Sequence, residues 1–217
     1  SSYSITAVAS DGVNEASQAI TVTITNVNEA PTITSTTTTF SAAENQTAIP
    51  GATITATDVD ADDTLTFSVS GDVLEIDANG VLSFATAPDF ETTTSVTATV
   101  TVTDAAGLFD TQEVTVTVTD VNDNAPVFTS DSAFTIDENT TSVTTLVTTD
   151  DDANSSVSYS ITGGADAGSF EIVGGVLKFV TAPDFESDAT TYTVEVTADD
   201  GVNEATQAIT VTITNVN

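Results

Sequence analysis

Cysteine, methionine, tryptophan and histidine are all absent from this chain of 217 residues, and Lys178 is its only basic side chain. Without cysteine the chain forms no disulfide, offers zinc no thiolate and has no thiol nucleophile. Without histidine or arginine it also lacks the common general base and the common oxyanion-stabilising cation of enzymes. These absences exclude most classes of enzyme before any motif is considered.

The acidic residues dominate what is present. Asp and Glu number 33 and give a formal net charge of −32, which repels nucleic-acid phosphates and anionic membranes and attracts cations. Hydrophobic residues make up 39% of the chain, and many are β-branched, so packed strands are favoured over disorder. No apolar stretch is long enough to cross a membrane, and no leader opens the sequence, so we expect any targeting signal to lie outside it.

The chain repeats itself with a period of 94 to 95 residues. "GVLSFATAPDFE" at 80–91 returns as "GVLKFVTAPDFE" at 175–186, and "AENQT" at 43–47 returns as "DENTT" at 137–141. "DGVNEASQAITVTITNVN" at 11–28 returns at 200–217 with a single change, Ser17 to Thr206. This self-similarity predicts a tandem array of like units. We expect the end of one repeat at 1–31 and two full repeats at 32–125 and 126–217.

Within each unit the hydrophobic pattern has a period of two. "QAITVTITN" and "EVTVTVTD" alternate aliphatic residues with threonine, and no helical apolar stripe persists. The short runs are separated by turn residues such as "NG", "GG" and "DG". This pattern predicts an all-β fold of Greek-key, immunoglobulin-like sandwiches with about seven strands each, joined in tandem.

Acidic residues and asparagines gather where the predicted strands end. The candidate residues are Asn26, Asn28, Glu29, Glu44, Asp58, Asp60, Asp62, Asp89, Glu91, Asp104, Asp120, Asn122, Asp123, Asn124, Glu138, Asp150, Asp152, Asn154, Asp184, Glu186 and Asp200. In an extended chain Asp150 and Asp152 point to the same side, so both can reach one ion. Ca²⁺ takes six to eight hard oxygen ligands, which such carboxylates, amides and carbonyls supply.

A Glu-Asn pair, a DxD strand end, an Asp-x-Glu, an AxD and a closing DxNDNAP occur in this order. The set resembles the calcium-binding motifs of cadherin repeats, and the resemblance covers essentially the whole chain. It implies sandwiches in tandem, with calcium held where one repeat, the linker and the next repeat meet. The ligands that it implies for the second junction are Glu44, Asp89 and Glu91, the linker residues Asp120, Asn122, Asp123 and Asn124, and Asp150, Asp152, Asn154 and Asp200 of the next repeat.

The first linker departs from this pattern. It reads "NVNEAP", one residue shorter than "DVNDNAP" at 120–126, and Asn26 and Glu29 replace aspartates. We therefore expect its site to bind fewer ions or to bind them more weakly. Tryptophan is absent, so the resemblance does not imply adhesion by exchange of a tryptophan between amino-terminal domains.

Two other interpretations of the acidic clusters stay open. Asp and Asn are common turn formers, and any one cluster can be a solvated turn without a ligand. A carboxylate pair such as Asp89 and Glu91 is also what a glycoside hydrolase uses. A catalytic pair that recurs in every repeat is unusual, however, and we expect no enzyme activity.

The sequence thus predicts a calcium-rigidified structural or adhesive repeat array, at the cell surface or secreted. Its composition resembles that of large bacterial adhesins. The expected partners are neighbouring repeats of the same array, with a homotypic or glycan partner as an alternative and no nucleic acid or inserted membrane. A further alternative is a subunit of an assembled extracellular filament. Residues 1–31 would form a hairpin whose apolar face, including Tyr3, Ile5, Ile20 and Val22, needs cover from beyond this chain.

Overall fold

The computed structural model of this protein describes residues 1–60, 63–153 and 155–217. Two of the predicted ligands, Asp62 and Asn154, lie outside the described residues. The chain divides into two compact units. Unit 1 comprises Ser1–Phe40, Ala48–Thr86 and Val96–Val116, and unit 2 comprises Ser41–Thr47, Ala87–Ser95 and Thr117–Asn217. The turn that follows β4 and the loop that follows β9 therefore belong to unit 2, together with the second linker.

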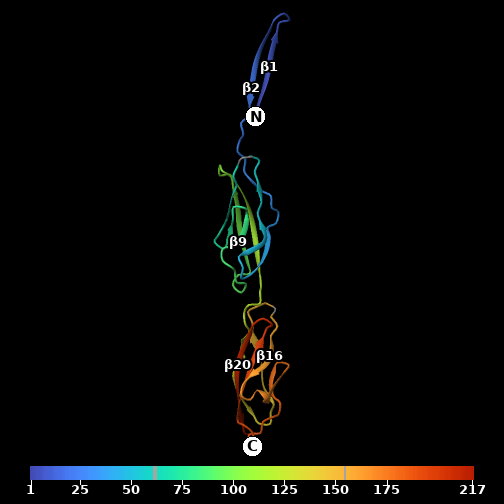
Figure 1. The fold of residues 1–217 in the computed structure, drawn as a ribbon, viewed down its shortest axis with the longest axis vertical. Helices are drawn as coiled ribbons and strands as arrows, with labels where there is room; N and C mark the ends of the chain where they lie inside the picture. Colours follow the sequence, from blue (N-terminus) through green and yellow to red (C-terminus); the bar gives the residue numbers. More distant parts are fainter. Residues whose placement is uncertain (61–62, 154) are drawn as a thin grey trace. The chain divides into compact units, whose positions relative to one another are not determined.

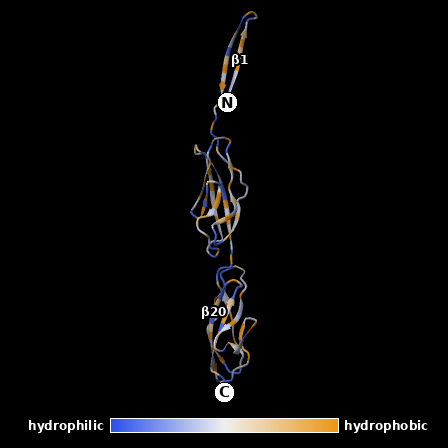
Figure 2. Ribbon diagram, viewed as in Figure 1, coloured by the Kyte–Doolittle hydropathy of each residue, from blue (hydrophilic) through white to orange (hydrophobic). Residues whose placement is uncertain are grey.

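An antiparallel hairpin opens the chain. Its strands are β1 (Ser2–Ser10) and β2 (Glu15–Thr23), drawn side by side in Figure 1. Their register pairs Tyr3 with Val22 and Ile5 with Ile20, so these four side chains share one face. The alternation of apolar and polar residues along the hairpin can be followed in Figure 2.

The structure describes nine strands between residues 32 and 119. They are β3 (Thr32–Ile33), β4 (Thr39–Ala43), β5 (Ala48–Thr53), β6 (Ala56–Thr57), β7 (Thr66–Val69), β8 (Leu74–Ile76), β9 (Val81–Phe84), β10 (Ser95–Thr103) and β11 (Phe109–Thr119). One sheet has the strand order β4-β11-β10-β7, a second has β5-β9-β8, and β3 pairs with β6. The aliphatic residues of β10 and β11 that alternate with threonine are buried, as the period of two predicts.

The same plan returns between residues 127 and 214. The elements are β12 (Val127–Phe128), β13 (Ala133–Asp137), β14 (Ser142–Thr145), β15 (Thr148–Thr149), β16 (Ser158–Gly163), the 3₁₀ turn η1 (Ala167–Ser169), β17 (Phe170–Val173), β18 (Val176–Phe179), β19 (Thr191–Asp199) and β20 (Glu204–Thr214). The sheets have the orders β13-β20-β19-β16 and β14-β18-β17, and β12 pairs with β15. β13 runs parallel to β20, while the other pairs are antiparallel. The predicted all-β sandwich fold is confirmed.

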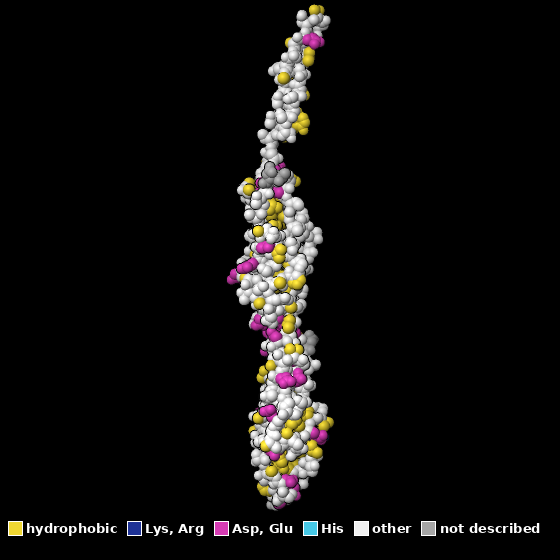
Figure 3. Space-filling view, in the orientation of Figure 1, with side chains coloured by type: hydrophobic (Ala, Val, Ile, Leu, Met, Phe, Trp, Pro, Cys, Tyr) yellow, Lys and Arg dark blue, Asp and Glu magenta, His cyan; other side chains and the backbone are white. Residues whose placement is uncertain are grey.

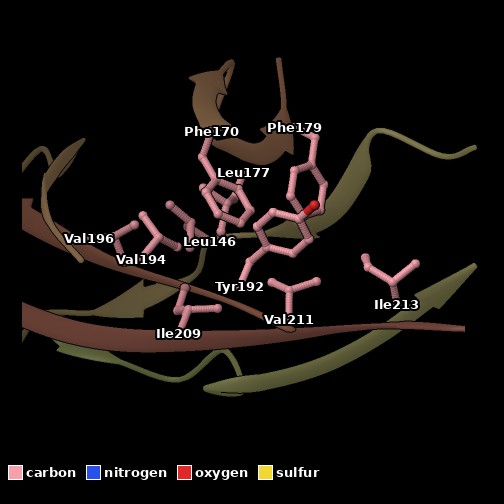
Figure 4. Close-up of a cluster of buried hydrophobic side chains, with 10 residues drawn as sticks. All are labelled: Leu146, Phe170, Leu177, Phe179, Tyr192, Val194, Val196, Ile209, Val211 and Ile213. Atoms are coloured by element: carbon pink, nitrogen blue, oxygen red, sulfur yellow. The ribbon is translucent and has the colours of Figure 1, made fainter. Parts of the chain in front are cut away.

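A cluster of aliphatic and aromatic side chains fills the sandwich of unit 2. Its aromatic centre is Phe170, Phe179 and Tyr192 (Figure 4), with ring centroids 4.3 Å apart for the two phenylalanines and 4.9 Å apart for Phe179 and Tyr192. Val194, Val196, Ile209 and Val211 come from β19 and β20 and lie in the same cluster. This core fixes the ends of β19 and β20, where the acidic loops begin.

The β1–β2 hairpin repeats the β19–β20 pair residue for residue. Tyr3 pairs with Val22 as Tyr192 pairs with Val211, a shift of 189 residues in both strands. Burial nevertheless differs, because Tyr3 is 59% exposed and Tyr192 only 9%. Strands with the same alternation of apolar and polar residues therefore pair in the same register in both places, but only β19 and β20 are covered by a sandwich.

The matched substitutions Ile20→Ala and Ile209→Ala should separate these two contexts. Ile209 is 1% exposed, so its truncation leaves a cavity and should cost about 2–5 kcal/mol of unfolding free energy. Ile20 is 38% exposed in the hairpin and should cost well under about 1 kcal/mol. Urea unfolding of both variants, followed by far-ultraviolet circular dichroism, measures the difference.

Removal of residues 1–24, which leaves the contacts of Asn26, Asn28 and Glu29 in place, checks the same point independently. The rest of the chain should unfold at an unchanged midpoint, since the apolar face of the hairpin is exposed. An equal cost for the two isoleucine substitutions, or a large loss of stability without the hairpin, would show that the hairpin is packed in solution.

In the part of the chain that the structure describes, no helix has the length and apolarity needed to span a bilayer.

Candidate metal centre

Glu44 connects three separate segments of unit 2. It is 3% exposed and sits in the turn after β4, where Asn45 takes the left-handed conformation at φ 61° that asparagine tolerates. One carboxylate oxygen accepts the backbone N–H of Phe90 at 2.6 Å, and the other accepts that of Val121 at 2.8 Å. The turn, the "PDFE" loop and the second linker are thereby tied together by one buried carboxylate.

Glu138 repeats this arrangement one period later. Its oxygens accept the N–H groups of Phe185 at 3.0 Å and Val216 at 2.8 Å, and Asn139 has φ 60°. The Glu-Asn pair found in the sequence therefore marks a defined structural motif, in which asparagine makes the turn and glutamate holds the chain that follows the last strand.

The DxD segment meets the second linker in unit 2. Asp150 accepts the N–H of Asp152 at 3.1 Å, and Asp152 accepts the N–H of Asn124 at 2.9 Å. The Asn124 side-chain amide also donates to Asp152, at 3.1 Å. These bonds hold the linker against the start of the third repeat, the one predicted at residues 126–217.

Asp200 follows β19 directly and lies beside the second linker. One of its oxygens accepts the N–H groups of Val202 and Asn203, each at 2.7 Å. The side-chain amide of Asn203 donates in turn to the Asn122 side-chain oxygen at 2.9 Å and to the Asn124 carbonyl at 3.0 Å. The β19–β20 turn thus orients the linker as well as the carboxylate.

Three groups of carboxylates form one continuous set in unit 2, and within each group the nearest oxygens lie within 4.8 Å of one another. The groups share Glu91 and Asp152, so seven carboxylates are linked. They are Glu44, Glu91 and Asp120; Glu91, Asp123 and Asp152; and Asp150, Asp152 and Asp200. Figure 3 shows carboxylates in small groups on an otherwise uncharged visible face. Lys178 pairs with Glu171 at 3.2 Å, on β18 and β17.

Several oxygens in this set are buried without a hydrogen-bond donor among the described residues. They include Asp120 Oδ1, Asp150 Oδ2 and Asp200 Oδ2. Burial raises the pKa of the Asp120 carboxyl above its usual value, and the charges of Asp152 and Glu44 add to the effect. The pKa of Asp200 is lowered, chiefly by the backbone N–H of Asn203. Like charges this close disfavour ionisation unless a counter-charge is present.

The donor set fits a hard divalent cation. It consists of carboxylate, amide and carbonyl oxygens, and the chain has no cysteine or histidine to favour zinc or copper. The buried oxygens without donors are the positions that a cation would satisfy. Irregular sets rich in carboxylates suit Ca²⁺ better than Mg²⁺, which demands octahedral geometry and keeps its waters.

Among the described residues, two further acidic groups lie elsewhere. Glu138, Asp184 and Glu186 form one in unit 2, with the Asn215 side-chain amide hydrogen-bonded to Glu186. Asp58, Asp63 and Asp104 form the other in unit 1.

The first linker lies beside the unit 1 group. The side-chain amide of Asn28 donates to Asp104 at 2.7 Å, while the Asn26 amide and the Glu29 N–H donate to Asp60. Burial raises the pKa of Asp104, but the Asn28 amide and three backbone N–H groups outweigh it and lower that pKa overall.

The sequence prediction and the structure differ in detail. Asp89 lies outside the carboxylate groups of the described residues, and its side chain accepts the N–H of Glu91 at 3.0 Å. Asp60 faces the first linker, and Asp63, which was not predicted, joins Asp58 and Asp104. Asn203 was also missed. Its neighbour Asp200 was the only signal for it, because nothing in "DDGVNE" shows that the turn reaches the linker.

Comparisons with known families identify two domain types. Residues 28–117 match the model for a bacterial Ig domain, and residues 132–215 match the model for a cadherin domain. Human Cadherin EGF LAG seven-pass G-type receptor 2 is 37% identical over 113 residues, which cover 48% of this chain and 4% of that protein. Mouse Protocadherin Fat 4 is 33% identical over 210 residues, covering 87% of this chain and 4% of that protein. The chain thus spans a small fraction of the length of these relatives.

Solved structures show the same architecture. Three domains of mouse Cadherin-23 (EC22-24) superpose with a TM-score of 0.77 at 21% identity, covering 99% of this chain and 74% of that one. Two domains of human Protocadherin-24 (EC1-2) give 0.72 at 23% identity, covering 88% of this chain and all of that one. At these identities the likeness establishes the fold alone.

Proposed function

Since this chain belongs to the proteins built of tandem cadherin-like repeats, we propose that it is a structural or adhesive segment of an extracellular array stiffened by calcium at its linkers. Repeats would be bounded at residues 31–32 and 125–126. Calcium suits an extracellular role, because sites in extracellular modules bind in the range of about 10⁻⁴–10⁻³ M.

The observation that carries this proposal is the linked set of seven carboxylates in unit 2, with buried oxygens that no donor satisfies among the described residues. These carboxylates come from three parts of the chain: the turn and loop of the second repeat (residues 32–125), the linker, and the third repeat (residues 126–217). A cation held by all three would fix the linker to both repeats. Without it, mutual repulsion would act on segments that only a few hydrogen bonds hold.

The residues of this chain have separable tasks in holding the ion. The ligands from the second repeat would be Glu44, Glu91 and Asp120. Those from the third repeat would be Asp150, Asp152 and Asp200. Asp123 lies in the middle group, and Asn122 and Asn124 would add amide or backbone oxygens. The cation supplies positive charge and crosslinks oxygen ligands. The backbone N–H groups that already bond Glu44 and Asp200 keep those carboxylates in place beforehand.

Homotypic adhesion and filament assembly remain compatible with this proposal, because a stiff array can serve either. The glycan-binding alternative gains no support from the families and relatives that match this chain. The matched families also give no reason to propose catalysis, and Glu91 is better accounted for by its grouping with the linker residues Asp120 and Asp123.

Small-angle X-ray scattering tests the mechanical role. With calcium in excess, the profile should be that of an extended particle of one narrow size distribution. With excess chelator at the same ionic strength, the distribution of maximal dimensions should broaden as the linker loosens. Magnesium at equal concentration is the control for charge screening, and indistinguishable profiles in calcium and chelator would contradict the proposal.

A further inference from the structure

The two linkers use the same backbone contacts. The Glu29 N–H donates to Asp60 at 3.0 Å just as the Asn124 N–H donates to Asp152 at 2.9 Å. In both places the second aspartate of the pair also donates its N–H to the first, Asp60 to Asp58 and Asp152 to Asp150. Differences between the linkers therefore lie in their side chains.

The aspartate after the long penultimate strand shows the first difference. Asp104 and Asp200 are both buried, at 5% and 9% exposure, and both accept backbone N–H groups on Oδ1. Asp104 Oδ2 also accepts the Asn28 side-chain amide at 2.7 Å. Asp200 Oδ2 has no donor among the described residues. The direct hydrogen bond from Asn28 therefore offsets part of the negative charge of Asp104 in the first linker.

The second difference is one charge in the linker itself. Asp120 has a buried oxygen without a donor among the described residues and joins Glu44 and Glu91. Asn26 stands at its place in the first linker and donates its amide to Asp60. An amide N–H cannot ligate a cation, and the loss of a carboxylate weakens a calcium site.

We infer that the two linkers respond to different calcium concentrations: the linker at 119–126 depends on the ion, whereas the linker at 25–31 satisfies part of its charge with its own Asn26 and Asn28 amides. This inference rests on the proposed calcium function. Asp58 Oδ2 still lacks a donor among the described residues, so the first linker keeps a site, but a weaker one. The array would then combine linkers that bind calcium and become rigid at low calcium concentration with linkers that do so only at a higher concentration.

Backbone amide resonances of the full chain, followed by two-dimensional NMR during a calcium titration, test this directly. The Glu29 and Asn124 amides are equivalent reporters, since each donates to the second aspartate of its pair. Asn124 should reach half-saturation at a calcium concentration at least about tenfold lower than Glu29, the effect expected of a lost charged ligand. Equal midpoints would overturn the inference while leaving the proposed function intact, and no shift at either amide would overturn both.

Asn26→Asp restores the missing carboxylate and should lower the Glu29 midpoint several-fold while leaving that of Asn124 in place. Asn79→Asp is the matched control, because it adds the same charge to an exposed turn between β8 and β9. Equal responses to the two substitutions would mean that long-range charge, not the linker side chains, sets the midpoint, and would overturn the inference.

Discussion

Removal of calcium with excess chelator is expected to lower the melting temperature of this chain by roughly 5–10 °C. An ion that binds only the folded state stabilises it by about 2.7 kcal/mol per site at a concentration of 100 times Kd. In a chain of this size each kcal/mol shifts the melting temperature by about 2–4 °C. The relief of repulsion among the seven linked carboxylates is part of this binding free energy. Differential scanning calorimetry in calcium and in chelator measures it.

Ionic strength must be held constant in this experiment. With a net charge of −32, any salt stabilises the chain by screening, and a chelator changes the salt content. Magnesium at the same concentration should recover only part of the loss. Superimposable melting curves in calcium, magnesium and chelator would show that the carboxylates hold no specific ion.

The second large effect that we expect is a loss of calcium affinity when a single ligand residue is substituted. Asp150→Ala and Asp123→Ala should each weaken calcium binding at the second linker at least about tenfold, because each removes a charged oxygen ligand. Asp150 should show the greater loss, since its Oδ2 is buried without a donor among the described residues, whereas Asp123 is exposed and accepts amide hydrogen bonds. Isothermal titration calorimetry of each variant gives the affinity and the number of ions lost.

Asp131→Ala and Asp166→Ala are the matched controls. Asp131 is exposed and precedes β13, and Asp166 accepts the Thr193 N–H at 2.8 Å, away from the linker. Neither should change calcium affinity, although Asp166→Ala should lower stability with and without calcium. If all four variants lose affinity equally, the ion is attracted by the overall charge of the chain and no site exists.

Asp150→Asn separates a ligand from a structural residue. The amide oxygen can still accept the Asp152 N–H, so the local hydrogen bond survives while one negative charge leaves the cluster. The variant should be less stable than the parent chain in calcium but no less stable in chelator, where the removed charge relieves repulsion. A loss of stability in both conditions would mean that Asp150 serves the fold alone.

The sequence by itself determined the elements of the fold. Strand alternation is local, because successive side chains of an extended chain face opposite sides, so "EVTVTVTD" places Val114, Val116 and Val118 on one face, and this face is buried in the sandwich. The period of 94 to 95 residues predicted the repeated sandwiches. The positions of the acidic residues at strand ends could also be predicted, because the alternating pattern shows where each strand stops and a loop begins.

Only the tertiary structure decided which of those carboxylates meet. Glu44 contacts Phe90 and Val121 across 46 and 77 residues of chain, and no spacing in the sequence predicts such a convergence. For the same reason Asp63, which was not predicted, joins Asp58 and Asp104, Asp89 lies outside the linked set of the described residues, and Asn203 was missed.

The hairpin shows the limit of sequence most plainly, because β2 and β20 share almost the same sequence and the same register. Ile20 is 38% exposed, while Ile209 is 1% exposed. Hydrogen bonds between adjacent strands require only the two strands, so the sequence determines the hairpin. Burial requires a second sheet, and its free energy depends on the surface that another part of the structure provides.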